Sequence, residues 1–364
     1  MNPLDGIEDI TILEFSPAAD EIWGLTADKV AGYYRRDDEK GILSFLDIPG
    51  HDTKVRPHVR TVYAGGKATN VGRILNTLIS AQDGTWPFAV APHLKVNLTT
   101  MLPGAPPDGP GTFSPGGEYI AALQRAEMHG VDLAFVPLPY CNAPNRDRRC
   151  IHLCDEATGA DLLNFSPHLK WRAEDLACAR HHLDTHPPRG LVVLAGSAPL
   201  GAVSLYSSVI QSRKRAHNSF VSADIDTASL LRCLSTSDTN PDAVSMNVHE
   251  HASIADWHGY GGLVHLHDRH GGALNRCGHN DLPARIDIAT LSAHFGPATG
   301  PTIGAGDAAH AGWLFGLLAG SFSPREALML GQATAAAVVR SESGTRRLDP
   351  KRIRRYFDVL RNAG

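Results

Sequence analysis

The strongest constraint on the fold lies in the second half of the sequence, where short apolar runs alternate with helical segments. Four runs each end in a loop that carries glycine or a polar residue, and they span residues 190–195, 219–223, 242–245 and 262–266. A segment with apolar residues at helical spacing, Leu205, Val209 and Ile210, follows the first run. This alternation predicts an α/β fold with a central, mostly parallel sheet flanked by helices. In such sheets, ligands bind at the carboxyl ends of the strands.

One loop has an unusual composition. Thr-Ile-Gly-Ala-Gly-Asp at 302–307 leads into an apolar, helix-forming segment at 308–318. Gly304 and Gly306 let the backbone turn its N–H groups toward one point, and a helix N-terminus adds free N–H groups and its positive dipole end. Together they predict an anion site, with phosphate the foremost candidate. Asp307 is then either a helix cap or the acceptor of a proton from a hydroxyl that attacks phosphorus.

A second glycine pair, Gly65 and Gly66, opens another predicted helix. Apolar residues recur there at helical spacing, namely Val71, Ile74, Leu75 and Leu78. Lys67 and Asn70 occupy the opposite side of its first turn. Two interpretations are open: a Gly-Gly turn followed by a solvated lysine, or a backbone packed close to a ligand that Lys67 and Asn70 reach.

The N-terminal segment predicts a first strand at 9–15 and a turn at 16–20, which places Asp20 just past the strand end. Strands are also expected at 41–48 and 59–63, with no helix between them, so they indicate an antiparallel flap. Residues 148–155 and 161–165 indicate a hairpin that joins this flap. We therefore expect a single domain over 1–364 with a small β lid built from two insertions, about 28–63 and 148–166.

Residues 98–119 are rich in proline and glycine and predict an irregular surface insertion. A helix at 120–129 and a strand at 132–137 follow. In the lid hairpin, Cys150, His152 and Cys154 alternate and would share one face of a strand. A structural zinc ion needs four ligands, and no convincing partner pair is present, so we expect no permanently bound metal.

Composition excludes several classes of function. Apolar residues make up 43 % of the 364 residues and charged residues 20 %, and the net charge is −4 with a pI of about 6.5. No attraction to nucleic acid or membranes is indicated. The six cysteines lack the spacing of a disulfide scaffold, and no signal peptide or membrane span is visible. We expect a cytoplasmic protein.

Taken together, these stretches resemble the ribokinase-like PfkB family of carbohydrate kinases. Residues 302–307 with Gly312 resemble its C-terminal signature, and Gly65-Gly66-Lys67 with Asn70 resembles its N-terminal one. The turn at 16–20 is similar to the Asn-Pro-x-x-Asp turn of the phosphofructokinase and tagatose-phosphate kinase branch, with serine in place of asparagine. The resemblance covers nearly the whole chain apart from residues 98–118.

The resemblance implies roles for individual residues. Asp307 would be the general base, and the backbone of Gly304, Ala305 and Gly306 would stabilise the transferring phosphoryl group. The sugar hydroxyls would be held by Asp20, Gly65, Gly66 and Asn70. The phosphate already on the sugar would be bound by Lys54, Arg148 and Ser197, assisted by Lys67.

The nucleotide side departs from the family pattern. Asn247 and Glu250 occupy the Asn-x-x-Glu position that organises Mg²⁺ with the phosphates of ATP, and Asp224 and Ser245 are assigned to the same region. Ser245 stands where the branch usually has a lysine that contacts the nucleotide phosphates. The bulky residues Asp268, Arg269 and His270 stand where small or flexible residues are expected.

The activity implied is transfer of the γ-phosphoryl group of ATP, with Mg²⁺, to a hydroxyl of a phosphorylated ketohexose of the fructose- or tagatose-phosphate type. Two alternatives are a kinase of an unphosphorylated sugar or nucleoside, and a catalytically weak homologue that binds sugar phosphates. The partners expected are small molecules, with no nucleic acid or membrane. Exposed edges of the lid predict a homodimer formed through it.

Overall fold

The computed structural model describes most of the chain. The described residues are 4, 6–25, 34–37, 42–45, 58–81, 86, 94–105, 112–139, 148–155, 161–215, 219–254, 257, 259–268, 270–276, 279–296, 298, 302–320, 322–341 and 344–363.

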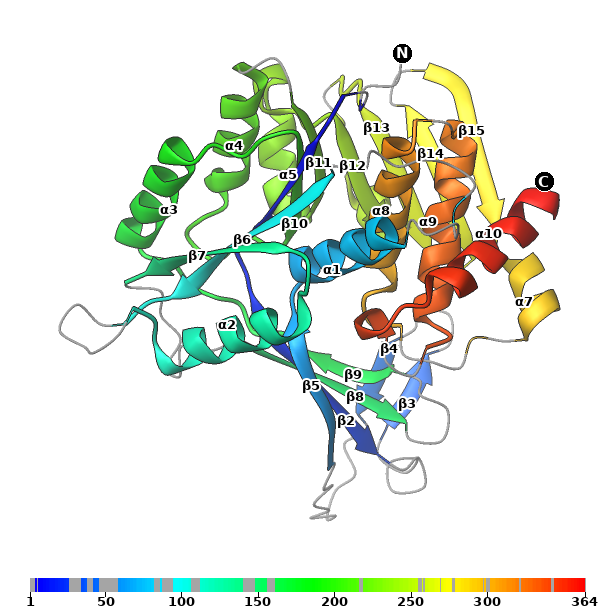
Figure 1. The fold of residues 1–364 in the computed structure, drawn as a ribbon, viewed down its shortest axis with the longest axis horizontal. Helices are drawn as coiled ribbons and strands as arrows, with labels where there is room; N and C mark the ends of the chain where they lie inside the picture. Colours follow the sequence, from blue (N-terminus) through cyan, green and yellow to red (C-terminus); the bar gives the residue numbers. More distant parts are fainter. Residues whose placement is uncertain are drawn as a thin grey trace.

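A large sheet forms the centre of the molecule (Figure 1). Within the described residues it has nine strands in the order β15-β14-β13-β12-β11-β10-β1-β6-β7. The strands are β1 (Asp9–Glu14), β6 (Lys95–Pro103), β7 (Asp132–Leu138), β10 (Leu191–Gly196), β11 (Phe220–Ile225), β12 (Ala243–Asn247), β13 (Leu263–Asp268), β14 (Gly271–Arg276) and β15 (His279–Asp287). The strands from β7 to β13 pair in parallel, and β14 and β15 add an antiparallel edge.

Helices cover both faces of this sheet. One face packs against α1 (Lys67–Ser80), α7 (Ala289–Phe295), α8 (Ala305–Leu318), α9 (Pro324–Val338) and α10 (Pro350–Ala363). The other packs against α3 (Ala173–Thr185), α4 (Ser204–Arg215) and α5 (Thr227–Leu234). Strand β10 shows why its sequence is a continuous apolar run: Leu191 and Val193 enter one core, while Val192 and Leu194 enter the other.

A small sheet projects from the large one and lies below it in Figure 1. Its strand order is β5-β2-β8-β9, with β2 (Ala18–Leu25), β5 (His58–Gly65), β8 (Arg149–Asp155) and β9 (Asp161–Phe165). A separate two-stranded ribbon pairs β3 (Tyr34–Asp37) with β4 (Ile42–Phe45). We refer to the four-stranded sheet as the lid sheet.

The predicted α/β class with a mostly parallel sheet and a small second sheet is confirmed. Two local predictions are wrong. Residues 98–103 belong to β6, a central strand whose Leu98, Met101 and Leu102 are completely buried, rather than to a surface insertion. Helix α2 (Pro115–Glu127) begins inside the same predicted insertion, and Ser114 caps it.

The lid also differs from the expected flap. Asp20 does not lie in a turn, because β2 begins at Ala18 and carries the chain directly into the lid sheet. Strand β2 pairs with β5 in antiparallel fashion but with β8 in parallel, so the lid sheet is mixed. The predicted hairpin of β8 and β9 is antiparallel, as expected. None of the helices in the described part of the chain combines the length and apolar character needed to cross a membrane.

Candidate active site

A cavity of about 580 Å³ lies between the lid sheet and the carboxyl ends of the central strands. Its walls come from strand ends, from the lid strands and from the starts of two helices. The lining residues are Ser16, Asp20, Gly66, Lys67, Asn70, Arg148, Cys150, His152, Asn164, Ser166, Gly196, Ser197, Asn247, Glu250, His267, Thr302, Ile303, Gly304, Gly306 and Asp307. Both glycine-bearing loops singled out in the sequence therefore meet in one cavity.

Most of the predicted site residues share this cavity. The residues it brings together are Asp20, Gly66, Lys67, Asn70, Arg148, Ser197, Asn247, Glu250, Gly304, Gly306 and Asp307. Four others, Gly65, Ala305, Asp224 and Ser245, are described but do not belong to its lining. Lys54 lies outside the described residues.

Asp307 lies in the first turn of α8, directly behind the glycine loop. Gly304 is the N-cap residue and has a left-handed conformation (φ 76°) that favours glycine. A Cβ atom on Gly306 would come within 2.8 Å of the His267 ring, so a larger residue there would require that ring to shift. Asp307 is the acidic residue of the first helical turn. Its Oδ2 accepts a hydrogen bond from Asn70 Nδ2 at 2.8 Å.

The surroundings of Asp307 change its acidity. Burial raises the pKa of this carboxyl group to about 7, and the carboxylates of Asp224 and Asp20 act in the same direction. Lys67 and the hydrogen bond from Asn70 oppose them by favouring the charged form. Near neutral pH this group therefore exchanges its proton readily.

Lys67 forms an ion pair with Asp224 beside the cavity. Its Nζ lies 2.5 Å from Asp224 Oδ1, and the lysine side chain is 39 % exposed while that of Asp224 is 1 % exposed. Burial acts to lower the pKa of Lys67, but Asp224 and Asp307 outweigh it and hold that pKa above its usual value. Asp224 therefore holds the ammonium group of Lys67 without lining the cavity itself, and Lys67 presents the positive charge to the cavity.

The N-terminal glycine pair is shaped by two carboxylates. A Cβ atom on Gly65 would overlap the carboxylate of Asp20, and one on Gly66 would lie 2.6 Å from Glu14 Oε2. Glu14 is completely buried and accepts hydrogen bonds from the backbone N–H groups of Ser16 and Thr69. Burial raises the pKa of Glu14 to about 7. Glu14 joins the first strand to the start of α1, a function that sequence reasoning did not identify.

Arg148 reaches the cavity from the root of the lid. Its Nη1 donates to the carbonyl of Ser16 at 2.6 Å, and its Nε donates to the carbonyl of Pro167 at 2.7 Å. Ser16 Oγ in turn donates to the carbonyl of Ser197 at 2.7 Å. The guanidinium thus fixes the turn after β1 against the lid sheet and still lines the cavity.

Asn247 and Glu250 form a capping box at the start of the short helix α6 (Val248–Ser253). Asn247 Oδ1 accepts from the N–H groups of His249 and Glu250, and Glu250 Oε2 accepts from the N–H of Asn247 at 2.9 Å. The spacing Asn-x-x-Glu is itself a capping signal, which the sequence interpretation missed. Both side chains line the cavity, so they offer oxygen atoms of the kind that Mg²⁺ and its bound waters prefer.

His267 separates this cavity from a second one of about 200 Å³. The second cavity is lined by Val248, Leu266, His267, Asp268, Gly271, Gly272 and Ala273, which are the residues around the predicted nucleotide loop. The Nε2 atom of His267 is buried and has no hydrogen-bond partner in the described part of the chain. Ser245 faces elsewhere: it is completely buried and pairs with His265 Nδ1 at 3.0 Å.

Four lid residues were not predicted to line the site: Cys150, His152, Asn164 and Ser166. His152 Nδ1 lies 3.0 Å from Asn164 Oδ1, and its Nε2 lies 3.7 Å from Asp20 Oδ1. Their positions depend on the pairing of β8 with β2 and β9, which local sequence does not encode. Among the described residues, no group of three or more His, Cys, Asp or Glu side chains is arranged to hold a metal ion.

Comparison with known proteins gives structural relatives only. No protein-family model and no curated protein matches the sequence. Phosphofructokinase-2 from Escherichia coli, in complex with substrates and products, has a TM-score of 0.65 and 16 % identity, over 97 % of this chain and 99 % of that chain. A possible 1-phosphofructokinase from Thermotoga maritima has a TM-score of 0.60 and 16 % identity, over 96 % of this chain and 97 % of that chain.

A third relative is the nucleoside kinase of Methanocaldococcus jannaschii, an archaeal member of the ribokinase family. It has a TM-score of 0.55 and 15 % identity, over 97 % of both chains. All three relatives are matched over nearly their full length, so the predicted ribokinase-like fold is confirmed.

Proposed function

We propose that this protein is an ATP-dependent carbohydrate kinase that phosphorylates a hydroxyl of a phosphorylated ketohexose. The observation that carries the proposal is the position of Asp307. Its buried carboxylate lies at the N-terminus of α8, beside the glycine loop, and faces a cavity that also holds Asp20, Asn70 and Lys67. A base and an anion site that share one cavity are what phosphoryl transfer to a hydroxyl requires.

In the proposed mechanism, Asp307 accepts the proton of the attacking hydroxyl. A general base works best when its pKa is near the working pH, and burial raises the pKa of Asp307 to about 7. The N–H groups at the start of α8 and the ammonium group of Lys67 stabilise the charge that grows on the transferring group. Bound Mg²⁺ would neutralise the phosphates, and Asn247 and Glu250 would hold its waters.

The lid sheet supplies the remaining wall of the acceptor site. Asp20 on β2 and His152 on β8 face the cavity, so the acceptor hydroxyls would be bound by the lid and the body together. Closing such a site excludes water, which would otherwise accept the phosphoryl group.

The acceptor class can be tested at Arg148. A charge-assisted hydrogen bond contributes about 1.5–3 kcal/mol, so Arg148→Ala is expected to weaken sugar-phosphate binding roughly 10- to 150-fold. The corresponding unphosphorylated sugar should bind almost unchanged. Isothermal calorimetry with fructose 6-phosphate, tagatose 6-phosphate and the free sugars measures both. Arg149→Ala is the matched control, because Arg149 directly follows Arg148, begins β8 and pairs with Glu21 instead.

Equal losses for the phosphorylated and free sugars would show that Arg148 serves the structure of the lid, which would leave open the alternative of an unphosphorylated sugar or nucleoside as acceptor. One observation supports that alternative: two nitrogens of Arg148 are already bonded to the carbonyls of Ser16 and Pro167, as expected for a structural arginine. The archaeal nucleoside kinase among the structural relatives has the same fold.

Nucleotide binding is expected to be weak. No lysine stands at 245, and the second cavity, where the nucleotide would extend beyond His267, holds only about 200 Å³. We expect a KM for ATP near the upper end of the usual range of about 1 μM to 1 mM. Steady-state rates at varied ATP measure this KM, and calorimetry with ATP and Mg²⁺ measures the binding affinity. Micromolar affinity would show that other residues replace the missing lysine, and complete absence of binding would favour a sugar-phosphate sensor over a kinase.

The proposed activity itself is tested by single turnover. A thermal-shift screen of sugar phosphates first selects the acceptor, and excess protein is then mixed with radiolabelled ATP, Mg²⁺ and that acceptor. Label transferred to the sugar supports the kinase, and its absence for every sugar phosphate and free sugar that binds would contradict it.

A further inference from the structure

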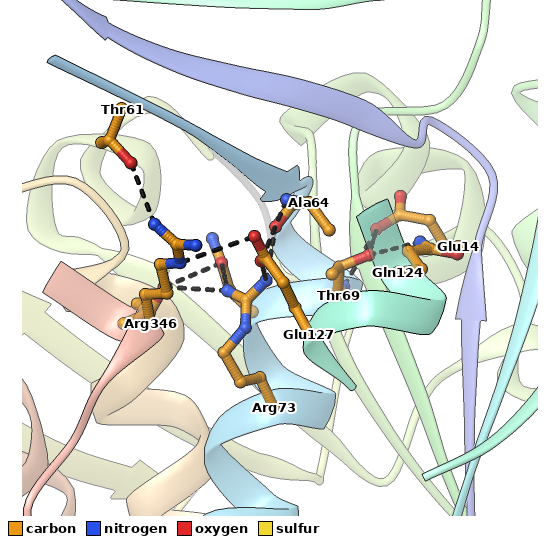
Figure 2. Close-up of polar contacts among 10 residues, drawn as sticks. Glu14, Thr61, Ala64, Thr69, Arg73, Gln124, Glu127 and Arg346 are labelled. Atoms are coloured by element: carbon orange, nitrogen blue, oxygen red, sulfur yellow. Dashed lines mark hydrogen bonds and ion pairs between the residues drawn. The ribbon is translucent and has the colours of Figure 1, made fainter. Parts of the chain in front are cut away.

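A polar network at the root of the lid sheet has a buried centre at Arg73 and extends to the candidate base. Figure 2 shows that it joins Thr61 and Ala64 of strand β5 to Arg73 of α1, Glu127 of α2 and Arg346. Arg346 belongs to the short 3-10 helix η3 (Gly344–Arg346). These residues come from four elements that are far apart in the sequence.

Arg73 is the centre of this network, and its side chain is only 5 % exposed. Its Nη2 donates to the carbonyl of Ala64 at 2.6 Å and to Glu127 Oε2 at 3.1 Å. Its Nη1 donates to Asn70 Oδ1 at 2.9 Å and to Thr345 Oγ1 at 3.1 Å. The planar guanidinium thus connects the lid strand on one side and the Asn70 amide on the other.

The Asn70 amide can take only one orientation in this setting. Its Oδ1 receives hydrogen bonds from Arg73 and from the hydroxyl of Thr345, the latter at 3.0 Å. A flipped amide would set its NH₂ group against the Arg73 N–H donor and would lose the hydrogen bond from the Thr345 hydroxyl. Nδ2 must therefore point away from them, and it donates to Asp307 Oδ2.

The part of the network that is farthest from Asp307 fixes strand β5 of the lid sheet. Glu127 Oε2 accepts from the backbone N–H of Ala64 at 3.1 Å, while Arg73 binds the carbonyl of the same residue. Arg346 lies 3.5 Å from Glu127 Oε1 and donates to Thr61 Oγ1 at 3.0 Å. Ala64 is paired with Ala19 of β2, next to Asp20. The position of β5 therefore also determines the position of Asp20 on the acceptor side of the cavity.

We propose that Arg73 is a positioning residue that orients the Asn70 amide toward Asp307 and thereby ties the proton affinity of the base to the seating of lid strand β5. The inference rests on the proposed function for its catalytic meaning. The chain of hydrogen bonds from Ala64 through Arg73 and Asn70 to Asp307, which we call the relay, is a property of the protein alone. The titratable groups that interact with Asp307 from the surrounding elements are Lys67 of α1, Asp224 of β11, Asp20 of β2 and Tyr63 of β5. Asn70 is the hydrogen-bond donor that Arg73 controls.

Two substitutions weaken the relay without removing its charge. Arg73→Lys keeps a cation beside Glu127 but cannot bond Asn70 and the lid strand at the same time. Thr345→Val removes the bridging hydroxyl and keeps the branched side chain that packs against Gly304. Both should let the Asn70 amide turn, which weakens its hydrogen bond to the charged form of Asp307 and raises the pKa of Asp307.

The readout is the acid limb of the pH profile of kcat/KM, which reports the free enzyme. Loss of about one hydrogen bond should move this limb upward by roughly 0.5–1 pH unit in Arg73→Lys and Thr345→Val. Thr345→Ser keeps the hydroxyl and should restore the wild-type limb. Arg354→Lys, at an ion pair with Asp358 on α10, is the control that should leave the profile unchanged.

A second readout does not depend on activity. With ¹³C-carboxyl-labelled aspartate, the NMR titration of Asp307 is identified by its absence in Asp307→Asn, and its midpoint should rise in both relay variants. An unchanged midpoint in folded Thr345→Val and Arg73→Lys would overturn the inference, as would a Thr345→Ser protein that behaves like the valine variant. If the protein had no kinase activity, only the kinetic readout would be lost.

Discussion

Replacing Asp307 by Asn is expected to lower kcat by roughly 10²- to 10⁴-fold, the usual contribution of a positioned base. Asparagine keeps the size of the side chain, and its carbonyl oxygen can still accept the hydrogen bond from Asn70 Nδ2. It cannot accept a proton from the acceptor hydroxyl. Steady-state kinetics over pH 5–9 measure the loss, together with the disappearance of the acid limb that the Asp307 pKa of about 7 imposes on the wild-type profile.

Sugar binding provides the control for this variant. The sugar phosphate should bind Asp307→Asn almost as it binds the wild type, since Asp20, Asn70 and Arg148 remain in place. Wild-type turnover in Asp307→Asn would end the general-base assignment. Loss of both turnover and sugar binding would show instead that Asp307 holds the site together.

The parts of the fold that sequence predicted well are those fixed by local burial. Strand β10 lies under helices on both sides, so its residues form an apolar run that is visible without any structure. Strand β6 was missed although it lies inside the sheet, between β1 and β7, because Thr99 and Thr100 interrupt its apolar pattern and Pro103 ends it. Thr100 is buried and bonds Gln124 of α2, a partner that no local pattern reveals.

The residues of the candidate site likewise fall into those that local sequence predicts and those whose positions depend on tertiary pairing. The positions of Gly304, Gly306 and Asp307 follow from a loop of fixed spacing before a helix, which is local information. The lid residues Cys150 and His152 enter the cavity only because β8 pairs in parallel with β2, and that register is a tertiary property. The roles of all the predicted site residues stay predictions, including those of Gly65, Ala305, Asp224 and Ser245, which lie outside the cavity lining.

The raised pKa of Asp307 also could not be predicted from the sequence, because burial in the folded protein causes it. That burial has a consequence for stability. The pKa of Asp307 is about 7 in the folded protein against 3.8 for an ordinary aspartate. Between these pH values the folded chain holds a proton that the unfolded chain has lost. The Asp307 contribution to the free energy of unfolding therefore falls as pH rises from about 4 to 7.

Asp307→Asn should therefore be more stable than the wild type above pH 7 and close to it at pH 4. The difference in pKa corresponds to roughly 4 kcal/mol at most, so a gain of about 2–4 kcal/mol is expected at pH 8. Urea denaturation of both proteins at pH 4, 6 and 8 measures the difference in the free energy of unfolding.

Comparing variant with wild type at each pH removes contributions that the two proteins share. Glu14, with a pKa also raised to about 7, lowers stability in the same direction, whereas His310, with a pKa lowered to about 4 by burial, makes stability rise over the same range. Asp358→Asn, at a surface ion pair on α10, should show no pH-dependent gain.

A gain at pH 8 together with lost turnover would mean that the site keeps a buried carboxylate for chemistry at the expense of stability. If Asp307→Asn were less stable than the wild type at pH 8, the Asp307 carboxylate would instead be a stabilising partner of Lys67, and a raised pKa would be excluded.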